Sequence, residues 1–420
     1  MADVTAGPML AADGTPLKVS LRRALRAQKM RSLMLIAPLL VFVLVTFLFP
    51  IADMLFRSVE NQIVPETLPS TVAALRDWDP AAEDLPGETA FAALHDDLTV
   101  AVEAKTHTRL GQRLNYEYSG LSSLMRGVGR DIDDMDTALP FKQQFIEADD
   151  KWGDPGVWQT IKAFSGRYTA AYLLNAVDLT LTPDGIAVKP PAERIYVKLF
   201  LRTVAMSLAI TFFCFLLGYP IAYLLASLPL RTSNLLLILV LLPFWTSLLV
   251  RTASWKVLLQ QQGVINDLLV WIGIIDNANR LVLINNATGT IIAMTHILLP
   301  FMILPLFSVM KTVPPTYLRA AKSLGANDWT AFWRVYFPQT IPGIGAGAIL
   351  CFILAIGYYI TPELVGGTSG IFISNRIAYH ISSSLNWGLA AALATLLLMV
   401  VLVLYYTYDR IVGIDNVKLG

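Results

Sequence analysis

Residues that could carry acid–base or metal chemistry are few and far apart in this sequence. The four histidines, His95, His107, His296 and His380, share no motif, and no HExxH occurs. No Gly-Lys pair exists, so the phosphate-binding loop GxxxxGK[ST] is absent as well. The acidic run over residues 131–136 lacks the glycine and the final glutamate of an EF-hand calcium loop. The sequence therefore predicts no catalytic residue, no metal site, no bound cofactor and no enzyme activity.

Polar and aromatic residues do interrupt two apolar runs. One cluster follows Pro243 and the other surrounds Pro362, and a helix broken at proline can present polar groups at membrane depth. The members that could contact a passing solute are Trp245, Thr246, Ser247, Tyr358, Tyr359 and Glu363. Aromatic faces beside one carboxylate suit a cationic amine, through cation–π attraction and charge. An aromatic belt at the membrane surface explains any single one of these residues at least as well.

The composition places the elements that carry these residues in a membrane. Of the 420 residues, 55% are hydrophobic and 15% are charged, whereas soluble domains have about 25% charged residues. Six charge-free runs are long enough to cross a bilayer. They cover residues 32–52, 203–230, 232–250, 281–310, 335–362 and 377–408. His296 lies in the fourth run, where a neutral histidine bonded to a neighbouring helix is a simpler interpretation than a functional group.

Two further features exclude other classes of protein. The 32 basic and 31 acidic residues nearly cancel, which argues against nucleic acid as a partner. Cys214 and Cys351 both lie inside apolar runs, so they predict neither a disulfide framework nor a zinc site.

The distribution of basic residues predicts the orientation. The N-terminal tail carries six of them, from Lys18 to Arg31, which predicts a cytoplasmic N-terminus. The first apolar run is too long for a signal peptide and is interpreted as a retained anchor. Six spans return the C-terminus, with Arg410 and Lys418, to the cytoplasm.

The hydrophilic stretch over about residues 57–195 is then expected outside the cytoplasm. It is acidic, with about 22 carboxylates against about 13 basic residues, and is long enough for a small domain. Residues 91–114 predict an amphipathic helix, and Pro-Asp-Gly within residues 180–191 predicts a turn or hairpin. The stretch is either a solvated acidic loop or a periplasmic docking surface.

A short surface helix is predicted after the fourth span. Pro314 and Pro315 can end that span, because proline cannot continue the hydrogen-bond ladder. YLRAAKSLG then suits a helix that Gly325 ends in a left-handed conformation, and Asn327 can cap the next helix. Without further information, an ordinary amphipathic connector explains this segment equally well.

The spacing within this segment resembles a known motif. Ala320-Ala321-x3-Gly325, nine residues, then Val335-x-Phe337-Pro338 is similar to the EAA loop of ABC importer permeases, Glu-Ala-Ala-x3-Gly-x9-Ile-x-Leu-Pro. In that family the loop forms a coupling helix that sits in a groove of the ATPase subunit. The resemblance implies that the contacts with the ATPase are made by Arg319, Ala320, Ala321, Leu324, Gly325 and Pro338. Arg319 stands where the family has Glu, which removes any acidic contact made at that position.

The resemblance extends over residues 200–408 and is strongest to the spermidine/putrescine-type permeases. It is carried by LPFWTSLLVRTASWKVLLQQQGVIND, LPFMILPLFSVMK, IGYYITPELVGG and the Asn-Trp before the last span. It implies a permease core formed by helices 2–6. With the six apolar runs, the expected fold is an all-α integral membrane protein with six transmembrane helices, a permease core and a periplasmic insertion between helices 1 and 2, which is larger than expected for these permeases. The expected parts are a cytoplasmic tail (1–31), helix 1 (32–56), the insertion (57–198), the core (199–411) with the coupling loop (312–338), and a second cytoplasmic tail (412–420).

The implied function is import across a bacterial inner membrane. An ATPase dimer that binds ATP and Mg²⁺, a second permease subunit forming a heterodimer rather than a homodimer, and a periplasmic solute-binding protein are the implied partners. The solute is expected to be a polyamine-like amine; another small solute, such as an amino acid derivative, a quaternary amine or an organophosphonate, is the alternative on the same scaffold. A secondary transporter is the alternative from another class, and it would be expected to have inverted repeats and buried ion-coupling acids.

Overall fold

The protein is described here by a computed structural model that covers residues 17–79, 85–182 and 185–412. Its contacts divide the chain between Phe56 and Arg57 into two units. Residues 1–16 of the expected N-terminal tail and residues 413–420 of the expected C-terminal tail, with Lys418, lie outside the described residues.

The first unit is one long apolar helix. It comprises α1 (Leu17–Val43), the π-helical segment η1 (Leu44–Leu48) and α2 (Phe49–Arg57), whose last residue belongs to the second unit. The π-helical segment ends just before Pro50, which has no N–H to donate to the carbonyl of Thr46. Residues 28–57 are long and apolar enough to cross a membrane, as predicted for the first span.

The hydrophilic insertion is a folded, mainly helical domain. Its helices are α3 (Ile63–Thr67), α4 (Pro69–Ala74), α5 (Glu88–Glu103), α6 (His107–Leu114), α7 (Leu121–Asp131), η2 (Ile132–Asp134), α8 (Phe141–Ala148), η3 (Asp150–Gly153), α9 (Pro155–Ala163), α10 (Ala171–Asn175) and η4 (Pro191–Glu193). They surround one apolar core in which Phe91, Phe145, Trp152 and Trp158 are fully buried. Burying these large rings stabilises a domain that the acidic composition alone did not predict.

The two strands of the predicted hairpin are confirmed, and the single helix predicted over 91–114 is wrong. Pro183 and Asp184 of the predicted turn lie outside the described residues. Strands β1 (Leu179–Thr182) and β2 (Gly185–Val188) pair antiparallel. The helix divides into α5 and α6, because Lys105 adopts a φ of 57° and Thr106 donates its N–H to the carbonyl of Ala101. This is a helix-ending motif that usually contains glycine, so a lysine there gave no sequence signal.

The remaining chain forms the membrane core. Its helices are α11 (Tyr196–Ser227), α12 (Leu230–Leu241), η5 (Leu242–Trp245), α13 (Leu248–Leu258), α14 (Val264–Trp271), α15 (Ala287–Thr312), α16 (Pro315–Ser323), α17 (Asp328–Ala331), η6 (Phe332–Tyr336), α18 (Phe337–Gly357), α19 (Ile360–Val365), α20 (Gly367–Gly370), α21 (Ile373–Ser382) and α22 (Trp387–Val412). The all-α membrane fold is therefore confirmed, apart from the small hairpin.

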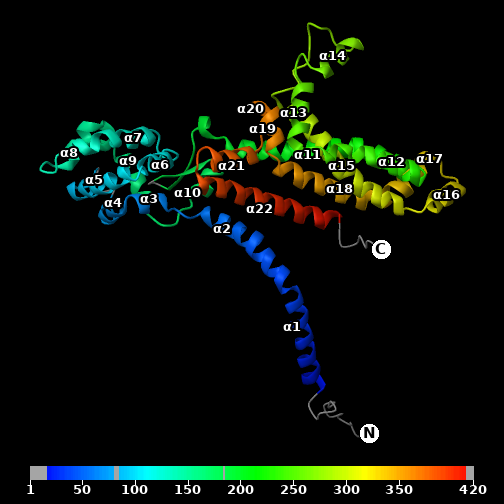
Figure 1. The fold of residues 1–420 in the computed structure, drawn as a ribbon, viewed down its shortest axis with the longest axis horizontal. Helices are drawn as coiled ribbons and strands as arrows, with labels where there is room; N and C mark the ends of the chain where they lie inside the picture. The colour runs from blue at the N-terminus through cyan, green and yellow to red at the C-terminus, as the bar shows by residue number, and fades with distance from the viewer. Residues whose placement is uncertain (1–16, 80–84, 183–184, 413–420) are drawn as a thin grey trace. The chain divides into compact units, whose positions relative to one another are not determined.

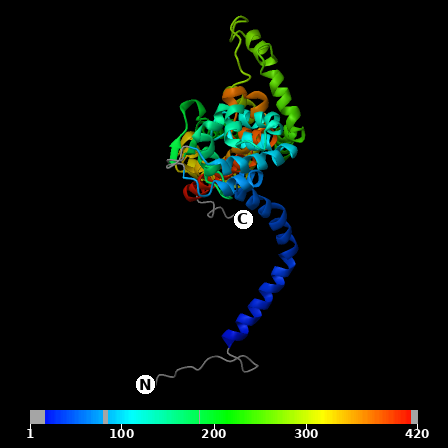
Figure 2. The same ribbon diagram turned by 90° about the vertical axis from the view of Figure 1, so that its left-hand side faces the viewer.

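The third predicted span differs from a simple transmembrane helix. Four helical segments of the core could span a membrane alone: α11, α15, α17 through α18, and α22. The run over 232–250 instead falls in a pair of helices bent by 91°, residues 230–245 and 248–258. Pro243 lies at the break, and α13 and α14 stand out from the bundle beyond it (Figures 1 and 2). A charge-free run shows where apolar chain lies but not where it bends.

Helix α15 packs between α11 and α18. A Cβ at Gly218 of α11 would lie 3.1 Å from the Met302 side chain, and one at Gly347 of α18 would lie 2.7 Å from its sulfur. Glycines at these places let the helix backbones approach closely, as helix pairs in membranes require. Gly343 of α18 also faces α15, because a Cβ there would lie 3.0 Å from the side chain of Val309.

The insertion is joined to the N-terminal ends of two core helices. The carboxylate of Asp178 accepts hydrogen bonds from the N–H groups of Ile195, Tyr196 and Val197, at 3.1, 3.0 and 2.9 Å, and so caps α11. The buried ring of Tyr172 packs on Gly388 at the start of α22. These contacts hold the insertion at one end of the bundle.

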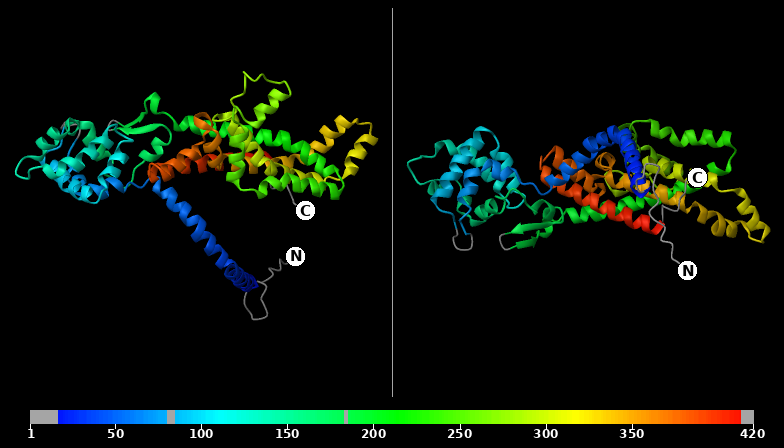
Figure 3. Two further views of the ribbon diagram at one scale, coloured as in Figure 1. Left: turned by 45° about the horizontal axis from the view of Figure 1, so that its top comes forward. Right: turned by 90° about the horizontal axis from the view of Figure 1, so that it is seen from below.

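The 312–338 loop lies at the opposite end. Lys311 reaches the carbonyl of Ala226 near the C-terminus of α11, and α16 and α17 follow it (Figures 1 and 3). Because α11 runs from the insertion to this loop, the two parts are separated by the length of the membrane helices.

We predict that Asp178→Ala destabilises the junction between the insertion and α11 by roughly 2 kcal/mol, because three N–H groups lose a charged acceptor. Asp178 also has a φ of 60°, which Asn tolerates better than Ala. Asp178→Asn should therefore lose less stability than Asp178→Ala. Thermal unfolding of the purified protein in detergent measures the difference. Asp77→Ala, at an exposed carboxylate, is the matched control, and equal melting temperatures for all three variants would contradict the capping role.

Candidate functional site

The segment that resembles an EAA loop is a short helix with a defined end. Helix α16 begins with Pro315 and ends in a Schellman motif, in which Ala326 bonds the carbonyl of Ala321 and Gly325 bonds that of Lys322. Gly325 has a φ of 92°, as predicted for a left-handed residue. The Asn327 side chain accepts the N–H of Thr330 at 2.7 Å, so the predicted cap of α17 is confirmed.

The residues predicted to contact a partner protein are accessible. Arg319 and Ala320 are exposed, Ala321 is half-buried, and Leu324 is 89% exposed. Tyr317 adds a second exposed apolar side chain on the same short helix. Pro338 is exposed at the start of α18, beyond the short helix. These side chains are therefore accessible to a partner, as the predicted contacts require.

An ion pair closes the turn between α16 and α17. Lys322 and Asp328 contact each other, and the hydrogen bond and charge of Asp328 raise the pKa of Lys322. Both side chains are exposed to solvent, so the pair orients the turn without adding much stability.

An aromatic cluster, which the sequence analysis missed, connects this loop to α11. Phe332 lies 6.2 Å from Tyr219 and 6.0 Å from Tyr223 between ring centroids, and Tyr336 lies 5.3 Å from Tyr223. The Tyr219 hydroxyl is also 3.2 Å from the Thr340 hydroxyl on α18. The available sequence signal was spacing. Tyr219 and Tyr223 are four residues apart, as are Phe332 and Tyr336, so each pair lies on one helix face. Phe332 and Tyr336 of the loop therefore pack against α11, and the segment η6 that carries them continues directly into α18.

The first cluster of predicted path residues lies at the bend of the broken span. Thr246 and Ser247 connect η5 to α13, and the Thr246 hydroxyl bonds the carbonyl of Pro243 at 2.7 Å. Trp245 is 70% exposed. In the described chain no ring pair joins Trp245 to Tyr358 or Tyr359.

The second cluster lies where α18 gives way to α19, and Asn375 organises it. The Asn375 amide donates to the carbonyl of Tyr359 at 2.9 Å and to Oε2 of Glu363 at 2.6 Å. The Ser374 hydroxyl binds the carbonyl of Tyr358 at 2.5 Å. Both donors come from α21, so side chains of α21 bond the carbonyls at the break between α18 and α19.

Glu363 faces an open pocket of about 320 Å³ that is also lined by the basic side chain of Arg376. The lining side chains include Glu363, Asn375, Arg376 and Tyr379. Arg376 stacks over the ring of Tyr379, 5.7 Å from its centroid, and its buried Nε has no hydrogen-bond partner among the described residues. Asn375 and Arg376 gave no sequence signal as site residues, because both lie in a segment without a motif.

The two clusters are connected through α13 and α19. The hydroxyls of Thr252 and Thr361 are 3.1 Å apart and buried. On the next turn of α13, Trp255 donates its indole N–H to Nδ1 of His296 at 3.1 Å. Nδ1 of His296 therefore accepts a hydrogen bond from a neighbouring helix, as predicted.

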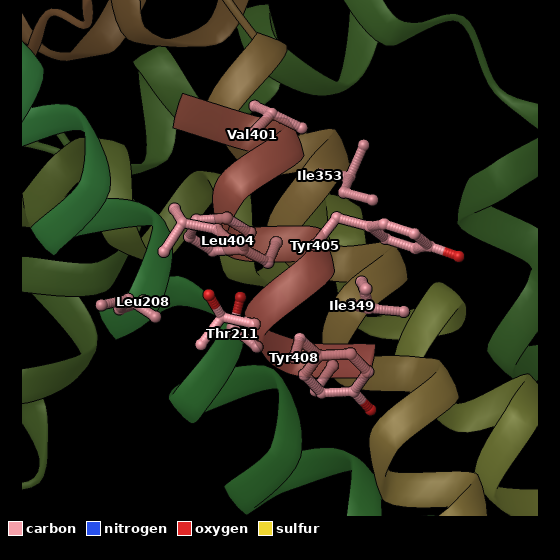
Figure 4. A pocket seen from close by; sticks show the side chains of 11 residues that line it. Leu208, Thr211, Ile349, Ile353, Val401, Leu404, Tyr405 and Tyr408 are labelled. Atoms are coloured by element: carbon pink, nitrogen blue, oxygen red, sulfur yellow. The ribbon is translucent and has the colours of Figure 1, made fainter. Parts of the chain in front are cut away.

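An apolar cavity of about 270 Å³ lies elsewhere, between α11, α18 and α22 (Figure 4). Its lining includes Ile349, Leu404, Tyr405 and Tyr408 but no charged side chain and no residue of either predicted cluster. A charged solute would find no partner there. Across residues 17–79, 85–182 and 185–412, no group of three or more His, Cys, Asp or Glu side chains could hold a metal ion.

Comparisons with known proteins place residues 194–412 in one family model, described as "Binding-protein-dependent transport system inner membrane component". The chain is 35% identical over 224 residues to the spermidine/putrescine transport system permease protein PotB of Salmonella typhimurium (strain SL1344), covering 53% of this chain and 77% of that protein. PotB of Escherichia coli K12 is equally similar, with 81% of its length covered.

A third relative is the inner membrane ABC transporter permease protein YdcU of Escherichia coli K12, 32% identical over 225 residues, with 51% of this chain and 71% of that protein covered. Among solved structures, a bacterial alginate ABC transporter in complex with a periplasmic protein matches with a TM-score of 0.42 at 18% identity, covering 51% of this chain and 77% of that chain.

Proposed function

Since this chain belongs to the family of inner-membrane components of binding-protein-dependent transport systems, we propose that it forms part of the import path for a small, amine-bearing solute of the polyamine class. It is a multi-pass membrane permease subunit of an ABC importer and not an enzyme. The observation that carries the solute class is the 35% identity to spermidine/putrescine permeases across the membrane core.

The proposal includes three partners. An ATPase dimer supplies ATP and Mg²⁺ chemistry, a second homologous permease completes the path as a heterodimer, and a periplasmic protein delivers the solute. The separate ATPase fits the absence of a GxxxxGK[ST] loop from this sequence.

The short helix α16 is proposed as the coupling helix that docks in a groove of the ATPase. Exposed Leu324 supplies an apolar contact, Ala320 and Ala321 allow close approach, and Arg319 supplies a positive charge. The aromatic cluster around Phe332 packs against α11, so a displacement of α16 would shift a membrane helix. This rigid link supports coupling better than a flexible connector would.

The solute path is proposed to pass the two clusters at the bend and at α19. Glu363 supplies the negative charge, Tyr358 and Tyr359 supply aromatic faces, and Trp245, Thr246 and Ser247 contribute at the bend. Of the carboxylate oxygens of Glu363, Oε2 is the one engaged by Asn375. A carboxylate with capacity to accept a further donor suits an ammonium group.

Arg376 supports a second candidate solute on the same scaffold. Its guanidinium lines the same pocket as Glu363, so a molecule with both an amine and a carboxylate, such as an amino acid derivative, would find both charges matched. Copurifying the intact complex and identifying its bound solute by mass spectrometry distinguishes the two. A polyamine supports the first proposal and a zwitterion the second, whereas a neutral or purely anionic solute contradicts both.

The orientation proposed from the basic residues has both termini in the cytoplasm and the insertion outside. Helix α16 and the insertion lie at opposite ends of α11, which supports placing them on opposite sides of the membrane.

We predict that Gly325→Val abolishes solute-stimulated ATP hydrolysis and uptake while the protein still inserts. A β-branched residue at a φ of 92° is strained, and the Schellman bonds that orient α16 would be lost. Gly325→Asn, which tolerates this conformation, is the control and should retain most activity. Arg319→Glu should be tolerated or change activity mildly, because an exposed single charge contributes little. Full transport by the valine variant would remove α16 as the coupling element.

We predict that Glu363→Gln lowers the uptake of labelled spermidine by about tenfold, which corresponds to about 1.4 kcal/mol. The glutamine can still accept the Asn375 bond, so the fold around α19 should persist. Glu193→Gln, at an exposed acid outside the pocket, is the matched control. Equal uptake by Glu363→Gln and Glu193→Gln would exclude Glu363 from a cation path.

We predict that a membrane-impermeant maleimide labels Ser119→Cys in intact spheroplasts and labels Ser323→Cys only after lysis. Both serines are exposed, and the native Cys214 and Cys351 are buried and should not react. Labelling of both variants from the same side would contradict the proposed topology.

A further inference from the structure

We infer that a basic groove between α6 and α7 of the insertion is the docking surface for a carboxylate-rich surface of the solute-binding protein. This inference rests on the proposed function, because it assumes that such a protein delivers the solute. It goes beyond that function by assigning the contact to named residues and by specifying the charge of the partner.

The groove is a defined feature of the domain. It is open, with a volume of about 560 Å³, and its lining residues are His107, Thr108, Ser123, Arg126, Gly129 and Arg130. On α7, Ser123, Arg126 and Arg130 are spaced by three and four residues, which places them along one face of the helix. His107 lies opposite, close enough that a Cβ at Gly129 would be 3.0 Å from its Nε2.

The helices that form the groove are fixed by close packing. A Cβ at Gly111 of α6 would lie 2.7 Å from the side chain of Met125 on α7, so the two backbones are in near contact. Leu110 and Leu114 of α6 and Leu124 of α7 are buried in the core of the insertion. The groove is therefore a rigid surface, and docking on it would require little ordering of the chain.

The groove gathers basic groups in an otherwise acidic domain, although Asp131 follows Arg130 at the end of α7. Every ionisable group of the lining is basic, and Lys151 adds a third cation, with its Nζ 3.4 Å from the Ser123 hydroxyl. Among the described residues, no ion pair involves Arg126, Arg130 or Lys151. Arg126 donates its Nε to the carbonyl of Ser122, which leaves its terminal nitrogens available.

This chemistry favours carboxylates on a protein over the anionic surface of a membrane. Guanidinium groups bind carboxylates in a planar, two-bond geometry, so paired arginines select individual acidic side chains. The domain as a whole has about 22 acidic and about 13 basic residues, so a uniformly anionic bilayer would repel most of its surface. A protein whose acidic residues lie only opposite the groove is attracted to it. The same acidic residues are repelled by the rest of the acidic insertion, which sets the docking position.

The groove is also placed where docking could influence the membrane helices. Arg113 of α6, which is buried, donates its Nε to the Tyr172 hydroxyl at 2.8 Å and pairs with Glu117, and Tyr172 packs on Gly388 of α22. The helix that carries His107 is thus joined by a short, buried chain of contacts to the start of α22. The buried pair of Arg113 and Glu117 resists separation, because leaving either charge buried without its partner would strongly destabilise the fold.

The first test compares two charge-reversal variants in the reconstituted complex, with spermidine-loaded binding protein added in increasing amounts. Arg126→Glu combined with Arg130→Glu should raise the half-saturating concentration of binding protein for ATP hydrolysis by about tenfold. Basal hydrolysis and the maximal rate should stay unchanged. Arg76→Glu combined with Arg167→Glu, which makes the same charge change at exposed positions elsewhere in the insertion, should leave the half-saturating concentration unchanged.

The outcomes separate this inference from the proposed function. If the wild-type complex is stimulated and both double variants behave alike, the groove is not the docking surface, although the importer function stands. If no binding protein stimulates the wild type, the proposed function itself fails. If the half-saturating concentration rises in nanodiscs containing phosphatidylglycerol but not in phosphatidylcholine alone, the groove contacts lipid and the inference is wrong.

The second test identifies the partner's chemistry directly and does not depend on a loss of function. Arg126→Lys combined with Arg130→Lys keeps the charge and supplies two amines that a carbodiimide can couple to a carboxylate in contact. Mass spectrometry of the cross-linked complex should find residues 126 or 130 joined to Asp or Glu of the binding protein. Cross-links only at native lysines away from the groove, such as Lys105, Lys142 and Lys162, would overturn the inference.

Discussion

The close contact of three membrane helices at Met302 determines how the rest of this protein can work. Gly218 of α11 and Gly347 of α18 both face this side chain, and neither position has room for a Cβ without displacement. Lipid chains are as apolar as leucine, so such helices associate through close packing rather than through the hydrophobic effect. With α15 held between α11 and α18, a movement at either end of one helix is transferred to the others.

The two ends of this bundle are attached to different polar parts of the chain. At one end, Asp178 caps α11 and Tyr172 packs on the start of α22. At the other end, Phe332 and Tyr336 pack against tyrosines of α11. In both places side chains pack directly between the polar part of the chain and a membrane helix. The proposed coupling to an ATPase on a separate chain would depend on such rigid contacts, because the solute and the nucleotide would bind to different chains.

The sequence predicted those features that depend on a single residue type or on composition. Charge-free runs located the membrane helices, and Pro315, Gly325 and Asn327 gave the start of α16, its end and the next cap. Each of these three residues has one dominant effect on the backbone, so the local sequence was sufficient to predict where each helix begins or ends. The predicted contacts of α16 and of the solute path involve other chains or a solute, and they stay predictions.

Features that depend on tertiary contacts were not predictable. The left-handed Lys105 divides a helix without a glycine signal, and the 91° bend after Pro243 lies inside a uniformly apolar run. Asn375 and Arg376 join the pocket of Glu363 only because α21 folds back against α19. No periodicity or spacing in one chain reports such long-range contacts, whereas the resemblance of the core to known permeases indicated its architecture.

Uptake of labelled spermidine into proteoliposomes distinguishes ATP-driven import from transport driven by an ion gradient. The vesicles contain the complex of this chain with its ATPase and second permease, and the loaded binding protein is added outside. The account predicts uptake that requires ATP inside the vesicles, requires the binding protein outside, and is unaffected by collapsing ion gradients. Uptake that proceeds without ATP and is driven by a proton or sodium gradient would contradict it.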